Sequence, residues 1–183
     1  MRGGAAVLAL ALAGCGGHAA AVKQEVPSEE RVASPALQRC YEVTELPRIA
    51  QAWGDNNATV AAFLSFEEEA AGCEALLVPA DKPEAEAAVL RAGLGLQRLQ
   101  MHRLAAQAYF AEQEMEQTCG TLQRALLQSD AMRGLFAAAK KVEDAALPES
   151  MQGMGVKVAD EANRLSGFFV FANETHCRDG SGE

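Results

Sequence analysis

Apolar residues recur every three or four positions over long stretches of this chain, and this periodicity constrains the fold more than any other feature. The clearest run carries Leu90, Leu94, Met101, Leu104 and Ala108 at spacings of 4, 7, 3 and 4. Such spacing places side chains on one face of an α-helix and is close to the heptad seam of packed helices. The sequence therefore predicts an all-α protein whose helices pack through apolar faces.

The same register continues to Ala139, so periodicity alone would allow one helix over residues 82–147. Those 66 residues would span about 99 Å at 1.5 Å each, which is too long for a compact domain. A break is therefore expected. Gly120-Thr121 offers a C-terminal glycine followed by a new cap, and Ser129-Asp130 is the alternative position.

Local start and stop signals place the other helices. Ser34-Pro35 predicts the start of a first helix, and Pro47 predicts a kink or restart within it. The polar run at residues 54–57 predicts a turn. A second helix then follows from about Ala58.

Asp81 is expected to cap the long third helix, and the loop at residues 148–155 is expected to precede a last helix from about Val156. Residues 167–171 could instead form a short strand, but no other segment offers a partner strand. Short loops between antiparallel neighbours favour a bundle of about five helices.

The chain begins with a short apolar segment. Arg2 precedes an unbroken run of Gly, Ala, Val and Leu over residues 3–14, which is the layout of a secretory signal peptide. This run covers 12 residues, whereas a membrane-spanning helix needs about 20. The segment is therefore interpreted as an export signal.

The apolar run ends in Leu12-Ala13-Gly14-Cys15, which resembles the lipobox of bacterial lipoproteins. The resemblance covers only the first 15 residues. It implies that a diacylglycerol is attached to the Cys15 thiol, that cleavage occurs before Cys15, and that the freed amine is often acylated. Two or three acyl chains, at about 0.8 kcal/mol per buried methylene, hold a protein firmly on a membrane. In that family an Asp after the cysteine retains the protein in the inner membrane, so Gly16 favours the outer membrane of the cell envelope.

The resemblance and the composition together divide the chain into four parts. Residues 1–14 are expected to be the signal peptide, residues 15–33 a lipidated N-terminus and flexible tether, residues 34–177 the helical bundle domain, and residues 178–183 a disordered tail. Cleavage removes one positive charge, so the formal net charge falls from −9 to −10. This acidic balance argues against a nucleic-acid partner and against a basic patch as a second membrane signal.

Four cysteines follow Cys15, namely Cys40, Cys73, Cys119 and Cys177. An even number in an exported chain indicates two disulfides, and sequence alone permits three pairings. None of the four belongs to a CxxC pair, which argues against zinc binding and thiol exchange.

The helical layout favours one pairing. In a hairpin that turns at residues 54–57, Cys40 and Cys73 lie 14 and 16 residues from the turn, or about 21 and 24 Å. Two further turns make the last helix parallel to the third and bring Cys177 beside Cys119. The prediction is therefore Cys40–Cys73 and Cys119–Cys177.

The sequence lacks the common catalytic motifs. No HExxH, GxSxG, phosphate-binding glycine loop, CxxCH or di-iron Glu-x-x-His is present, and His18, His102 and His176 have no metal-ligand spacing. The chain is therefore predicted not to be an enzyme and to use no cofactor or metal. Met151 and Met154 could hold Cu(I) through their thioethers, but a glycine-rich turn with apolar contacts is favoured.

Other polar and aromatic residues receive structural interpretations. His102 is interpreted as a surface or boundary residue, and the acidic triplet at residues 67–69 as a solvated helix face. Trp53, Tyr109 and Phe110 could mark a recognition surface, although core packing is favoured.

These features predict a membrane-anchored envelope lipoprotein whose helical bundle binds an unidentified protein partner as an adaptor or assembly factor. Pilotins, which are small helical disulfide-bonded lipoproteins that escort secretin subunits, share this general layout without a motif match. The alternative is a lipoprotein that binds a small ligand or a metal in a pocket between helices.

Overall fold

The computed structural model describes residues 34–177, without the side chains of residues 52, 53 and 71, and every regular element among them is helical. This confirms an all-α bundle, with six α-helices and two 3-10 helices where about five helices were predicted. In order they are α1 (Pro35–Trp53), α2 (Asn56–Leu77), α3 (Glu84–Ala111), α4 (Met115–Ala131), α5 (Arg133–Lys140), η1 (Asp144–Ala146), η2 (Glu149–Met151) and α6 (Met154–His176). The signal peptide, Cys15, His18, the tether and the tail lie outside the described residues.

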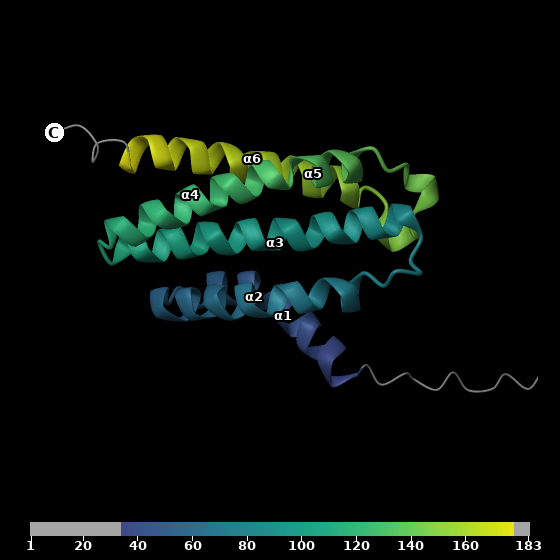
Figure 1. Cartoon of the computed structure of the whole chain (residues 1–183), viewed down its shortest axis with the longest axis horizontal. Helices are drawn as coiled ribbons and strands as arrows, with labels where there is room; N and C mark the ends of the chain where they lie inside the picture. The colour runs from purple at the N-terminus through teal and green to yellow at the C-terminus, as the bar shows by residue number, and fades with distance from the viewer. Residues whose placement is uncertain (1–33, 178–183) are drawn as a thin grey trace, which may run out of the picture. The chain divides into compact units, whose positions relative to one another are not determined.

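Helix α3 lies between two groups of helices, with α1 and α2 on one side and α4, α5 and α6 on the other (Figure 1). On the first side, Met101 and Ala105 of α3 pack with the phenyl rings of α2, Phe63 and Phe66. On the second side, Leu99 of α3 belongs to a cluster contributed by α4, α5 and α6. The fold therefore has two apolar cores that share one helix, and none of the helices at residues 34–177 is long and apolar enough to cross a membrane.

Side-chain caps fix the starts of the first two helices. The Ser34 hydroxyl accepts a hydrogen bond from the Leu37 N–H at 3.2 Å, and the Asp55 carboxylate accepts one from the Ala58 N–H at 3.0 Å. Gly54 ends α1 with φ of +62°, a left-handed conformation that glycine adopts without steric cost. The predicted turn at residues 54–57 is therefore present, and α2 begins two residues earlier than expected.

Two boundaries differ from the predictions. Of the kink or restart predicted at Pro47, the restart is absent, and α1 continues through Pro47 with Val43 and Ala50 buried on either side. Asp81 does not cap α3. Pro83 occupies the cap position and makes no side-chain cap hydrogen bond.

The break in the long periodic segment lies at residues 112–114, and Gly120 is inside α4. Gln113 has φ of +61°, a conformation that usually requires glycine. The N–H of Glu114 donates to the Tyr109 carbonyl at 2.9 Å, and the N–H of Gln113 donates to the Phe110 carbonyl at 3.0 Å. This is a Schellman motif with glutamine at the glycine position, so the sequence carried no glycine to mark it.

A second interruption separates α4 from α5 at Met132, close to the alternative break position at Ser129-Asp130. Helix α6 then packs closely against α5. A Cβ atom on Gly155 would collide with the Ala139 carbonyl, so only glycine allows this approach.

Both predicted disulfides are confirmed. Cys40–Cys73 joins α1 to α2 with a Cα–Cα distance of 5.3 Å, and Cys119–Cys177 joins α4 to the residue after α6 with a distance of 5.6 Å. Helices α3 and α6 run in the same direction, with α4 antiparallel to both (Figure 1). The layout from which the pairing was predicted is therefore correct, although its turn at Gly120 was misplaced by several residues.

Candidate functional site

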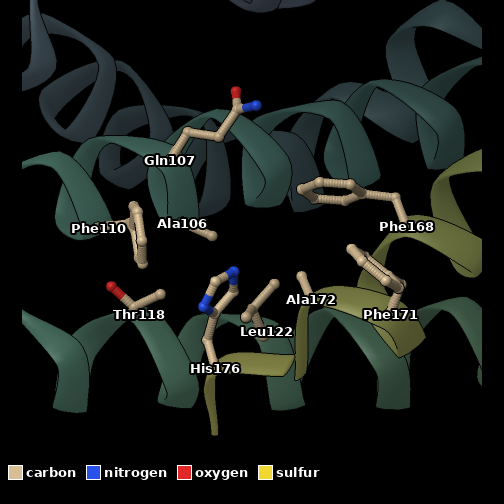
Figure 2. Close-up of a pocket in the computed structure, with 9 residues that line it drawn as sticks. All are labelled: Ala106, Gln107, Phe110, Thr118, Leu122, Phe168, Phe171, Ala172 and His176. Carbon is tan, nitrogen blue, oxygen red and sulfur yellow. The ribbon is translucent and has the colours of Figure 1, made fainter. Parts of the chain in front are cut away.

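An apolar groove of about 220 Å³ lies between the ends of α3 and α6 and the beginning of α4. We call it the aromatic groove. Figure 2 shows its residues, with the Phe110 ring on one side, the Phe168 and Phe171 rings on the other, and the His176 ring between them. It is lined by Ala106, Gln107, Phe110, Thr118, Leu122, Phe168, Phe171, Ala172 and His176.

Small side chains open the floor of this groove. Ala106 and Ala172 are buried beneath it, beside the buried residues Thr118 and Leu122. Alanine allows helices to approach closely but fills little space above the backbone. The depression is therefore built into the sequence of α3 and α6, where a larger residue at either alanine would fill it.

Large aromatic side chains form the walls and stay accessible to solvent. Phe110 is 46% exposed and Phe171 is 68% exposed. Phe169, two residues before Phe171 on α6, is completely buried. The Phe110 ring contacts the His176 ring, with centroids 4.8 Å apart and planes 50° apart. Exposed aromatic residues around a concave floor are typical of binding surfaces.

The Cys119–Cys177 disulfide holds the groove in shape. Cys119 directly follows Thr118 on α4, and Cys177 directly follows His176 at the end of α6. The bond therefore fixes a lining residue from each helix relative to the other. The turn at residues 112–114 completes the arrangement, because it brings Phe110 and Thr118 to the same end of the bundle.

Among the residues that the structure describes, no acidic side chain lines the groove. Glu112 and Glu114, on the turn between α3 and α4, border a different hollow together with Asn56, whose amide donates to the Glu112 carboxylate at 3.1 Å. Glu116 borders a third hollow together with Arg124. The polar side chains of the groove itself are those of Gln107, Thr118 and His176.

The amino-acid sequence pointed to part of this site. Core packing was favoured for Phe110, and this is wrong, because its side chain is 46% exposed and lines the groove. Tyr109 is half-buried against the core to which α2 contributes, as favoured. The Trp53 side chain lies outside the described part of the chain. Phe168 and Phe171 were missed, although four successive apolar residues at 168–171 on one helix cannot all face a core.

His102 is buried, with 3% of its surface exposed, so its interpretation as a surface or boundary residue is wrong. Its Nε2 lies 2.8 Å from the Gln128 side-chain oxygen and 3.8 Å from Glu67, and its ring contacts Phe63 with centroids 4.8 Å apart. Burial lowers the pKa of His102, opposed by Glu67. His102 thus joins α2, α3 and α4 as a structural residue.

Two residues of the acidic triplet at 67–69 form ion pairs with neighbouring helices, which the prediction of a solvated face did not include. Glu69 accepts two hydrogen bonds of 2.7 Å from the Arg39 guanidinium of α1, and Glu67 pairs with Arg98 of α3 at 3.2 Å. Glu67 and Glu69 are half-buried, and only Glu68 of the three is exposed to solvent as predicted. Across residues 34–177, no group of three His, Cys, Asp or Glu side chains could hold a metal ion.

Met151 and Met154 line a second groove of about 370 Å³, together with Tyr41 of α1, Lys82 of the loop between α2 and α3, and residues of α2 and α3. Both methionines therefore border the same groove, and thioether sulfur is a ligand that Cu(I) accepts. The Lys82 ammonium, which pairs with Glu86 at 2.9 Å, places a positive charge in the same lining. No family model, curated protein or solved structure matches the chain, so its function is inferred from these sites.

Proposed function

We propose that this chain is an envelope lipoprotein, anchored through lipid on Cys15, whose helical domain binds a protein partner at the aromatic groove. The lipobox resemblance at residues 12–15 supports the anchor, and Gly16 in place of an Asp after the cysteine supports an outer-membrane location. The observation that carries the binding role is the exposed pair Phe110 and Phe171 above an apolar floor. Aromatic side chains at such sites contribute strongly to protein–protein binding.

The anchor is tested by replacing its cysteine. Cys15→Ala in the full chain is expected to abolish labelling with a fatty-acid analogue and to move the protein from the membrane fraction to the soluble fraction. An unmodified N-terminus in the native protein, found by mass spectrometry, would contradict the anchor. It would leave the groove unaffected.

The binding role is tested by photo-crosslinking in living cells. A photoreactive amino acid at position 171 is expected to give a defined crosslinked partner, and the same residue at position 127 is the control. Leu127 is 72% exposed on α4 but does not line the groove. Equal products from both positions, or none from position 171, would contradict a partner at the groove.

The second groove supports an alternative function as a small-ligand or metal-binding lipoprotein. Its specific support is that Met151 and Met154 line one concave surface. Cu(I) is then expected to raise the melting temperature of the protein, and Met151→Ala with Met154→Ala is expected to remove this effect. A shift that persists in the double variant would exclude these thioethers as the ligands.

A further inference from the structure

We infer that the protein partner places an arginine or lysine side chain in a hollow between α2 and the end of α3, which we call the carboxylate hollow. It measures about 300 Å³. Its lining includes Val60 and Leu64 of α2, Tyr109 of α3, and Glu112 and Glu114 of the turn between α3 and α4. The inference rests on the proposed function in taking the occupant to be part of a protein, and it adds a contact outside the aromatic groove.

The turn at residues 112–114 brings two carboxylates to this hollow. Gln113 has a left-handed conformation with φ of +61°, and the glutamates on either side of it both line the hollow. The Glu112 carboxylate accepts a hydrogen bond from the Asn56 amide of α2 at 3.1 Å, which holds it beside α2. Glu112 and Glu114 are both exposed, so a group of the partner can reach them.

The charges around the carboxylate hollow have one sign. Among the described residues that line it, none is a lysine or an arginine. The two segments that build it, residues 54–66 and 104–118, contain four acidic residues and no basic one. Arg124 lines a neighbouring hollow that shares Tyr109, and there it is accompanied by Glu116. A cationic group therefore complements the carboxylate hollow.

The helix dipoles do not reverse this sign. The positive ends of α2 and α4 lie at this end of the bundle, and so do the negative ends of α1 and α3. Their partial charges oppose one another, so the carboxylates determine the local charge.

The walls of the hollow suit the stem of a long cationic side chain. Leu64 is 54% exposed, and Val60, one turn earlier on α2, is half-buried. Lys and Arg place their aliphatic stems on apolar surface while their charged groups reach polar partners. A guanidinium can also stack on the Tyr109 ring and form paired hydrogen bonds with a carboxylate, so Arg fits better than Lys. Because Tyr109 lines this hollow and the next residue, Phe110, lines the aromatic groove, one partner can contact both surfaces.

The test compares two labelled synthetic peptides on the purified full-length mature protein in a non-ionic detergent. Both peptides form a helix with a Leu face, and one carries Arg where the other carries citrulline, which has a similar shape without the charge. Fluorescence anisotropy is expected to show that the Arg peptide binds at least about tenfold more tightly. No preference, or no binding of either peptide, would overturn the inference.

Variants of the protein locate the charge that is recognised. Glu112→Gln with Glu114→Gln is expected to remove the preference, because an amide oxygen at position 112 can still accept the hydrogen bond from Asn56 but carries no charge. The matched control is Glu143→Gln with Glu149→Gln, at two exposed residues that line neither surface. It removes the same formal charge and is expected to keep the preference at about 0.15 M salt, where the Debye length is about 8 Å. Equal losses from both pairs would show general attraction to an acidic protein and would overturn the inference.

A variant of the aromatic groove separates this inference from the proposed function. Phe171→Ser is expected to leave the preference for the Arg peptide unchanged, because Phe171 does not line the carboxylate hollow. Loss of the preference in Phe171→Ser would place the Arg peptide in the aromatic groove and would overturn the inference. A missing crosslink from position 171, with the preference intact, would refute the aromatic groove alone.

A divalent cation is the other occupant that carboxylate and amide oxygens can take. Addition of Ca²⁺ is expected to leave the melting temperature of the protein unchanged. A rise that is absent in Glu112→Gln with Glu114→Gln would identify a metal ion as the occupant and would overturn the inference.

Discussion

The α1–α2 hairpin and the α4–α6 layer lie on opposite faces of α3, and each is closed by a disulfide of similar geometry. The hairpin core is filled by large side chains, including Phe63 and Phe66. The layer buries Phe136 and Phe169 together with five alanines on α4, α5 and α6, and it leaves Phe171 68% exposed. Two small buried residues of this cluster, Ala106 and Ala172, line the groove, and no larger side chain fills the space between the exposed Phe110 and Phe171 rings.

The largest expected effect comes from removing the disulfides one at a time. The bonds close loops of 33 and 58 residues, for which chain entropy gives about 4 kcal/mol each. Paired Cys→Ser substitutions at positions 40 and 73, or at 119 and 177, should therefore lower the free energy of unfolding by similar amounts, measured by urea denaturation.

Their effects on the groove should differ. Loss of Cys119–Cys177 frees His176 and the end of α6, so partner binding at the groove, measured as the crosslink from position 171, should fall severalfold at temperatures where the protein stays folded. Loss of Cys40–Cys73 should leave binding unchanged. Equal loss of binding in both variants would mean that the two regions are not independent.

A smaller effect tests the close packing of the layer. Gly155→Ala is expected to destabilise the protein by about 1–3 kcal/mol, because the new methyl group collides with the Ala139 backbone. A methyl group added at Gly167 on the same helix would meet nothing within 4 Å, so Gly167→Ala should instead stabilise by about 0.5–1 kcal/mol. Thermal unfolding of both variants measures the contrast. Stabilisation by both substitutions would show that α5 and α6 can separate at no cost.

His102 links the two regions and predicts a dependence of stability on pH. Burial lowers its pKa below the ordinary value of 6.5, with Arg98 and Arg124 acting in the same direction and Glu67 opposing them. The unfolded chain therefore binds a proton that the folded protein does not. The contribution of neutral His102 to the free energy of unfolding is present above pH 6.5. It is lost as the pH falls through 6.5 toward the pKa of the folded protein, by at most about 1.4 kcal/mol per pH unit.

Urea midpoints between about pH 5 and pH 8 measure this dependence. His102→Gln should flatten the profile in that range, and His176→Gln, at an exposed position, is the matched control. An unchanged slope in His102→Gln would assign the acid sensitivity to carboxylates elsewhere.

Helical periodicity and cysteine spacing were sufficient to predict the helical class and both disulfides. Boundaries that depended on a single residue were less predictable. Gln113 takes a conformation expected of glycine, and Pro47 remains inside α1 because buried neighbours outweigh its lost hydrogen bond. Tertiary contacts determine both helix boundaries, and the local sequence around Gln113 and Pro47 does not reveal these contacts.

The groove was largely invisible in the sequence for a related reason. Phe110 and Phe171 are 61 positions apart, and they line one groove because α3 and α6 run in the same direction and end together (Figure 1). Which phenylalanine of residues 168–171 stays exposed depends on the rotation of α6, and core packing of Phe169 fixes that rotation. The alternation of buried and exposed rings is therefore a result of the tertiary structure.

The smallest expected effect on stability completes the contrast between core and groove. Phe171→Ser should change the free energy of unfolding by no more than about 0.5 kcal/mol, because the ring is 68% exposed. Leu127→Ser, at a residue 72% exposed, should cost a few tenths of a kcal/mol more, because Leu is the better helix former. For partner binding we expect the opposite order: Phe171→Ser loses binding and Leu127→Ser keeps it. A loss of stability above about 1 kcal/mol in Phe171→Ser would place that ring in the core, and the groove would then lack its principal wall.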